Sequence, residues 1–208
     1  MKENRQIKDE ALVLFRSNYW LCVVVVFVAM AIDGVCSALG ARHHAAAFSG
    51  LLGLVVSGPV LIGLNWFFVQ LQRNRPADMD TMFVKGFGEN LGRHVGGYLL
   101  TALFTFLWSL LFFVPGIIKA LSYSLTTYLL ADRPELTAQE ALIESMRMME
   151  GKKGKLFCLF LRFLGWLILS GLTGGILYVF YVGPWINTAM AGFYEEVKAA
   201  DMRGYVNY

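Results

Sequence analysis

The 208 residues of this chain suffice for one domain or two small ones, and 57% of them are hydrophobic while only 16% are charged. Soluble domains average about 45–50% apolar and about 25% charged residues, so the composition argues against an ordinary soluble domain. The formal net charge of +3 is small, and the basic residues form short runs beside apolar segments, which argues against nucleic-acid binding.

The first apolar segment covers residues 19–41. The second begins after the polar break at 42–44 and ends at Gln72. Residues 21–32 also have the length of a signal-peptide core. The segment before them is long, carries both signs of charge and is patterned as a helix, so we expect a retained first span. A membrane-spanning helix needs about 20 apolar residues, which the first segment supplies.

Four more apolar segments follow two polar stretches, 73–94 and 132–155. The third and fourth fill residues 95–131 around Pro115-Gly116, and the fifth and sixth fill residues 156–194 around Gly183-Pro184. Proline fits the first turn of a helix, where its missing N–H costs nothing. Each Pro/Gly pair therefore predicts a tight turn that opens a short return helix.

Lys and Arg residues predict the orientation, because cytoplasmic loops carry an excess of them. With six spans, one side holds both termini and both polar stretches, which contain nearly all of the 18 Lys and Arg residues. The opposite side holds Arg42 and Lys119. We expect a cell-membrane protein whose N-terminus and C-terminus are cytoplasmic.

An amphipathic helix is predicted before each long apolar segment. The third has a capping-box pattern at Thr137 and Glu140. The expected apolar stripes are Ile7, Ala11, Leu12 and Phe15; Met79, Met82, Phe83 and Phe87; and Leu142, Met146 and Met149. With a hinge in each hairpin (the first at Gly58-Pro59), this suggests one domain, 1–208, made of repeats 1–72, 73–132 and 133–197. The alternative is that any six-helix protein with short outer loops looks similar.

Three ionisable residues, Asp33, Lys119 and Arg162, fall inside apolar segments, where charges are costly and mark candidate functional sites. Asp33 and Lys119 lie at similar predicted depth, so we hypothesise that they share a buried polar site near the outer face. The alternative is that Lys119 extends to the interface and Asp33 meets water. Arg162, close to the cytoplasmic end, is expected to reach lipid phosphates.

The return helices carry polar side chains, among them Asn65, Ser122 and Asn187. We group these three with Asp33 and Lys119 as a candidate intramembrane binding site. The alternative is that they hold helices together by hydrogen bonds.

The basic run Lys152, Lys153 and Lys155 predicts, with Arg162, contacts to anionic lipid headgroups. No catalytic motif occurs, and adjacent histidines at 43 and 44 make a poor metal site, so we expect neither an enzyme nor a cofactor or metal. The cysteines, Cys22, Cys36 and Cys158, form no CxxC and are expected to be buried thiols.

The second half contains a recognisable set of segments. They are Phe113-Val114-Pro115-Gly116-Ile117-Ile118-Lys119-Ala120-Leu121-Ser122-Tyr123-Ser124, Leu130-Ala131-Asp132, Glu140-Ala141-Leu142, Ser145, Met148-Met149, Gly151, Leu156-Phe157, Gly165-Trp166, Thr173-Gly174-Gly175 and Phe193-Tyr194. These resemble a family of uncharacterised bacterial multi-pass integral membrane proteins, domain of unknown function 975. The resemblance covers residues 73–197 well and the first third loosely. It implies an inner-membrane protein with no assigned activity.

The predicted fold is an all-α membrane protein of six transmembrane helices in three hairpins, with short interfacial amphipathic helices on the cytoplasmic side. The predicted function is non-enzymatic binding or scaffolding of membrane lipids or of a membrane partner, which includes a second copy of the chain. The alternative is a small transporter or permease subunit that works through a polar intramembrane site.

Overall fold

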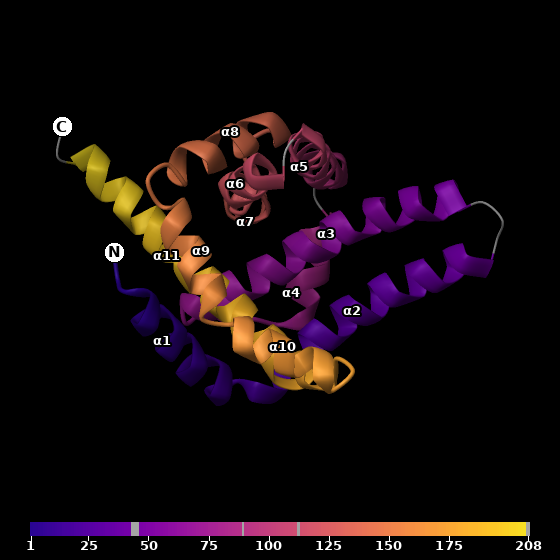
Figure 1. The fold of residues 1–208 in the computed structure, drawn as a ribbon, viewed down its shortest axis with the longest axis horizontal. Coiled ribbons are helices and arrows are strands. Elements are labelled where there is room, and N and C mark those ends of the chain that lie inside the picture. The colour runs from indigo at the N-terminus through magenta and orange to yellow at the C-terminus, as the bar shows by residue number, and fades with distance from the viewer. Residues whose placement is uncertain (43–45, 89, 112, 207–208) are drawn as a thin grey trace.

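A computed structural model describes residues 1–42, 46–88, 90–111 and 113–206, and every regular element in these ranges is a helix, as predicted. The elements are α1 (Asn4–Ser17), α2 (Tyr19–Arg42), α3 (Ala46–Gln72), α4 (Met79–Phe83), the π-helix η1 (Val84–Gly88), α5 (Leu91–Leu111), α6 (Phe113–Tyr123), α7 (Thr126–Asp132), α8 (Ala138–Met148), α9 (Lys153–Leu161), α10 (Leu164–Leu172), the π-helix η2 (Tyr178–Val182) and α11 (Gly183–Val206). Figure 1 shows α2 and α3 side by side as a long arm that projects from the other helices.

Helix α1 uses its predicted apolar stripe to pack on the rest of the chain. Ile7, Ala11 and Phe15 are buried, and α1 lies along α11 in Figure 1. A capping box between Glu3 and Gln6 satisfies backbone groups at its start. The stripe is therefore confirmed as a packing face directed at the protein itself.

The first hairpin differs from its prediction at Gly58-Pro59, where α3 continues without a turn. Proline removes one backbone hydrogen bond inside a helix, so neighbours have to hold the segment in place. Gly58 lies against Tyr98 of α5, and Gly86 of η1 comes so close that a Cβ there would lie 2.5 Å from the Pro59 carbonyl oxygen. Packing on both sides overrides the hinge signal. The break at 43–45 lies outside the described residues.

The second hairpin turns where it was predicted. Pro115 lies in the first turn of α6, and a Cβ on Gly116 would lie 2.5 Å from Ser109 Oγ, so glycine permits the close approach to α5. The return path then breaks between α6 and α7. At the break, Ser145 Oγ of α8 donates to the Ser122 carbonyl and accepts from Leu125 N–H.

Helix α8 has the predicted capping box, with Thr137 Oγ1 accepting from Glu140 N–H. The two other predicted stripes are directed inward only in part. Met82, Leu142 and Met149 are buried and Met146 is half-buried, whereas Phe87 is exposed.

The fifth segment was predicted as one helix, but α9 and α10 are bent by 41°. Phe163 at the bend is buried against Trp185 of α11, with ring centroids 5.0 Å apart. Gly174 and Gly175 then turn the chain with φ of 62° and 86°. Helix α11 begins at Gly183 directly after η2, and Gly183 has helical φ and ψ of −60° and −55°. The turn predicted at Gly183-Pro184 therefore lies at Gly174-Gly175 instead, and the return helix is longer than predicted.

Among the described residues, two helices are long and apolar enough to cross a membrane, with windows Tyr19–Cys36 and Val55–Gln72. The bent pair α9–α10 brings the number to three if it counts as one crossing. The six predicted spans are thus not confirmed, because the other segments are split into shorter helices or carry polar residues.

Candidate functional site

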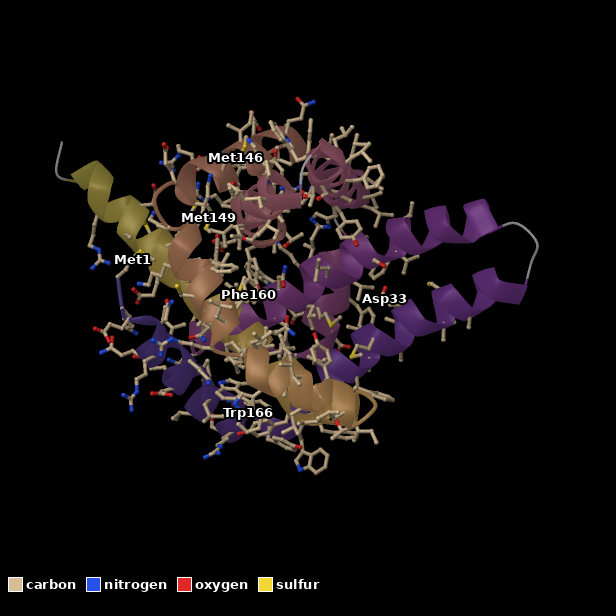
Figure 2. The ribbon with its side chains drawn as sticks, in the orientation of Figure 1. Met1, Asp33, Met146, Met149, Phe160 and Trp166 are labelled. Atoms are coloured by element: carbon tan, nitrogen blue, oxygen red, sulfur yellow. The ribbon has the colours of Figure 1, made fainter. Side chains whose placement is uncertain are left out.

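The structure does not bring Asp33 and Lys119 together. The exposed Asp33 carboxylate accepts a 2.7 Å hydrogen bond from Ser57 Oγ of α3. The Lys119 ammonium lies 4.9 Å from the ring centroid of Trp108 and lines a cavity with Met146. Figure 2 shows Asp33 on α2 well apart from Met146 on α8. The predicted shared site is not formed, because Asp33 accepts from α3 while Lys119 of α6 lies against α5 and α8. Lys119 also shares a cavity with Lys153, so the structure does not separate these two lysines, which the predicted orientation places on opposite sides.

Of the three remaining residues, Ser122 lines a cavity together with Lys119, whereas Asn65 and Asn187 make hydrogen bonds elsewhere. Asn65 Nδ2 donates to Thr127 Oγ1 at 2.8 Å in the buried contact of α3 with α7. Ser122 Oγ and Asn187 Nδ2 each donate to the carbonyl four residues earlier in their own helix. This arrangement supports the alternative in which these groups satisfy hydrogen bonds within and between helices.

The predicted headgroup residues lie at the start of α9 and at the bend that follows it. Lys152 Nζ donates to the Met148 carbonyl at 3.0 Å, and Lys155 Nζ donates to the Lys2 carbonyl. Arg162 is exposed at the bend, and Lys153 lines a cavity beside α8. Lys153 therefore borders a hollow.

A buried ionic cluster around Asp132, which the sequence reasoning missed, joins three helices. One Asp132 oxygen lies 2.7 Å from Arg73 Nη1, and the other accepts from Tyr194 at 2.7 Å and from Lys198. Arg73 also pairs with Glu195 at 2.8 Å. The Asp132 side chain is only 4% exposed. These residues come from the end of α7, the residue after α3, and successive turns of α11.

Hydrogen bonds and neighbouring charges determine the protonation states of Asp132 and Arg73 in this cluster. Burial alone would raise the pKa of Asp132, but hydrogen bonds from Arg73, Lys198 and Tyr194 outweigh it and hold the pKa well below its usual range. Burial opposes the charge of Arg73 as well, and Asp132 and Glu195 raise the pKa of its guanidinium. Asp132 and Arg73 are therefore both charged in the folded chain. Part of the cluster is visible in the sequence, because Asp132 and Tyr194 belong to the segments that carry the family resemblance. Arg73 and Lys198 lie among the basic residues that predict only the orientation in the membrane.

Arg93 provides a second polar connection, between α5 and α7. Its guanidinium donates to the carbonyls of Leu130, Arg133 and Leu136 at 2.7, 3.0 and 2.8 Å. Carbonyl groups at the end of a helix lack partners inside it, and a cation favours that end. Arg93 therefore anchors the C-terminal end of α7 to the start of α5.

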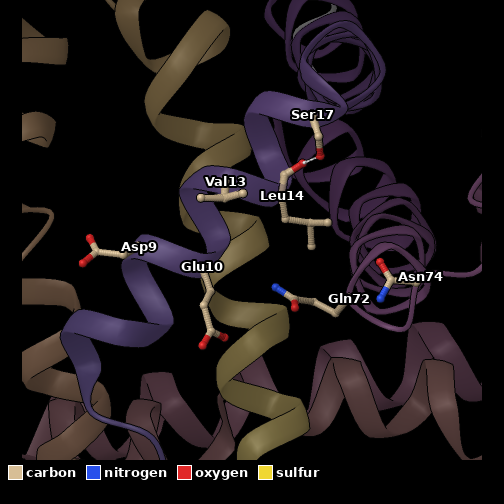
Figure 3. A pocket seen from close by; sticks show the side chains of 7 residues that line it. All are labelled: Asp9, Glu10, Val13, Leu14, Ser17, Gln72 and Asn74. Atoms are coloured by element: carbon tan, nitrogen blue, oxygen red, sulfur yellow. Dashed lines mark hydrogen bonds between the residues drawn. The ribbon is translucent and has the colours of Figure 1, made fainter.

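A surface groove of about 490 Å³ lies between α1 and the C-terminal end of α3 (Figure 3). Asp9 and Glu10 stand on its α1 side, and Gln72 and Asn74 on its α3 side. A second cavity of about 280 Å³ shares Glu10 and Gln72 with it and reaches Arg73 of the ionic cluster.

The described residues contain no group of three or more His, Cys, Asp or Glu side chains placed to hold a metal ion. Cys22 is buried as predicted, whereas Cys36 is half-buried and Cys158 is exposed on α9. Because a cysteine side chain behaves as a small apolar group, an exposed thiol on α9 is compatible with contact to lipid.

The fold and its cluster define an all-helical protein with helices of membrane-spanning length. Residues 110–201 match the family described as "Protein of unknown function (DUF975)", so the predicted resemblance is confirmed for this part of the chain. The match includes Asp132, Tyr194 and Lys198 but not Arg73. No curated protein and no solved structure matches the chain.

Proposed function

We propose that the chain is a six-segment integral membrane protein of three hairpin units, with both termini cytoplasmic, that scaffolds membrane lipids or a membrane partner without catalysis. The observation that carries this proposal is the meeting of the three return segments at Asp132. Arg73 follows α3, Asp132 ends the path α6–α7, and Tyr194 and Lys198 lie on α11. Three return paths that end at one charged cluster support a chain built of three hairpin units.

The outer surface supports a membrane location. Large apolar side chains are exposed on α2, α5 and α10, including Phe27 at 55%, Phe106 at 63% and Leu172 at 80%. Soluble monomers rarely expose contiguous apolar patches beyond a few hundred Å². Lipid tails solvate such side chains at no cost, so the same surface is stable in a bilayer.

Reporter fusions test the topology. Alkaline phosphatase folds only outside the cytoplasm, so a fusion after Gly40 is expected to be active, whereas fusions at Lys85, at Lys153 and at the C-terminus are expected to be inactive. Fluorescent-protein fusions at the same sites should give the reciprocal pattern and serve as the expression control. The proposal also requires that the chain stays in the membrane fraction after a carbonate wash. Activity from the Lys153 fusion contradicts the topology.

The broken helices favour a small transporter as the second candidate. Discontinuous helices in transporters expose backbone groups around a substrate site, and here α6–α7 and α9–α10 are both broken. Solute flux into proteoliposomes that contain the purified chain, compared with empty liposomes, is the measurement that separates a transporter from a scaffold.

A further inference from the structure

Two lysines on neighbouring elements lack an acidic partner. Lys119 of α6 and Lys153 at the start of α9 are both half-buried, and neither belongs to an ion pair of the described residues. The adjacent Arg147, in contrast, is paired with Glu144 and Asp201, at 2.8 and 2.7 Å. The two ammonium groups thus have no ion-pair partner among the described residues, although Glu150 lines a cavity with both of them.

Both lysines line one cleft made of two adjoining cavities. The first has a volume of about 370 Å³ and lies between α5, α6 and α8. The second has a volume of about 400 Å³ and lies between α6, α8 and the start of α9. Lys119, Ile143 and Met146 line both cavities and so form the boundary between them.

The two halves of the cleft differ in chemistry. One face of α5 supplies Leu100, Phe104 and Trp108 to the first cavity, opposite Leu142 of α8, so this half is apolar. The second half holds polar groups, which are Ser122, Arg147, Glu150 and Lys153. The Lys119 ammonium lies 4.9 Å from the Trp108 ring centroid and 6.0 Å from that of Tyr123, where cation–π attraction holds it at the boundary.

We infer that this cleft, defined by Lys119, Lys153, Trp108 and Ile143, binds one anionic phospholipid, with an acyl chain along α5 and the phosphate between the two lysines. The inference rests on the proposed function, because it needs a bilayer to supply the ligand. Basic pockets beside membrane helices bind anionic headgroups. A free phosphate would leave the apolar half empty, whereas a phospholipid fills both halves and neutralises both ammonium groups.

The test uses the full-length chain purified in detergent and freed of lipid. Native mass spectrometry follows the binding of phosphatidylglycerol and of phosphatidylcholine with identical acyl chains. We expect phosphatidylglycerol to bind more tightly, and Lys119→Met or Lys153→Met to weaken it by about fivefold each. Ile143 is 60% exposed, so Ile143→Glu should leave folding intact and still weaken binding by placing a carboxylate between the lysines.

Lys85→Met is the matched control, because Lys85 Nζ lies 4.9 Å from the Trp66 ring centroid but lines neither cavity of the cleft. This variant is expected to bind phosphatidylglycerol like the unchanged chain. Equal binding of the two lipids, equal losses in Lys85→Met and Lys119→Met, or displacement of the lipid by inorganic phosphate overturns the inference. If the chain resists carbonate extraction, any of these results contradicts the lipid site but not the proposed function. If carbonate releases the chain from the membrane, the proposed function itself is contradicted.

Discussion

Asp132 is the most deeply buried acid in the ion pairs of the described residues, with its side chain 4% exposed. A carboxylate this deeply buried would be unstable alone, since burial of an unpaired charge costs several kcal/mol. Arg73, Lys198 and Tyr194 compensate it from two other helices. The charge therefore adds specificity, because it is satisfied only when α3, α7 and α11 end together.

Asp132→Asn is predicted to destabilise the folded chain by about 2–3 kcal/mol, because it leaves Arg73 and Lys198 partly buried without their shared acid. This loss of stability is smaller than that for a fully buried ion pair, because the Arg73 and Lys198 side chains are 18% and 20% exposed. Thermal unfolding of the detergent-solubilised chain, followed by circular dichroism, measures the change. The exposed Asp78→Asn is the control and should shift stability by less than about 0.5 kcal/mol. Equal effects of the two substitutions would contradict a stabilising cluster.

The same cluster predicts a dependence on acid pH. Because the folded pKa of Asp132 lies below its usual value, the folded state binds fewer protons than the unfolded state in the interval between the two pKa values. The stabilisation is complete above about pH 4, the unfolded pKa of an aspartate, and is lost as pH falls through the folded pKa. We expect the unfolding temperature to drop more steeply between pH 4 and pH 2 in the unchanged chain than in Asp132→Asn. Parallel curves would show that other groups control acid unfolding.

At the scale of elements, close backbone contacts position the short helices against the long ones. Helix α3 meets α4 at Gly63, where a Cβ would lie 2.3 Å from the Met82 carbonyl oxygen and 3.1 Å from its carbon. Because backbone atoms form this contact, no rotamer change relieves a clash. Gly63 therefore sets the distance between α3 and the amphipathic helix of the second unit.

Gly63→Ala is predicted to destabilise the fold by about 2 kcal/mol or more, because α4 has to move away from α3. Gly53→Ala on the same helix is the matched control, since nothing lies within 4 Å of its added Cβ. Alanine is the better helix former by about 1 kcal/mol, so the control should be neutral or stabilised. Thermal unfolding of the two variants in parallel measures this. A stabilised Gly63→Ala would show that α4 does not pack there.

Local signals explain which elements were predictable. Thr137 and Glu140 marked the start of α8, and Pro115 marked the start of α6, because capping and turn chemistry act within a few residues. Pro59 and the bend at Phe163 were misjudged, because long-range packing decides both. The Asp132 cluster was missed for the same reason: its members are separated by up to 125 positions, from Arg73 to Lys198, and each has an ordinary topological explanation by itself.

On the scale of the whole molecule, the inside and the outside are apolar in different ways. Residues such as Phe15, Phe67 and Phe193 fill the interior, while comparably large side chains cover the outer faces of α2, α5 and α10. The sequence alone does not distinguish interior positions from lipid-facing positions, because the same apolar residue types occupy both. The proposed topology assigns lipid to the outside of α2 and water to the outside of α1, and the two solvents respond oppositely to a charge.

Phe27→Arg against Val13→Arg tests this assignment. Phe27 is 55% exposed within the apolar window Tyr19–Cys36 of α2, and Val13 is 70% exposed on α1. If lipid surrounds α2, an arginine near the centre of the window costs about 3 kcal/mol, and the chain is expected to lose abundance in the membrane fraction and resistance to urea extraction. On α1 the arginine meets water, so Val13→Arg should remain near the level of the unchanged chain. Immunoblots of membrane and soluble fractions after matched expression measure both variants. Full tolerance of Phe27→Arg would place water at α2, and the six-segment proposal would then fail at its first crossing.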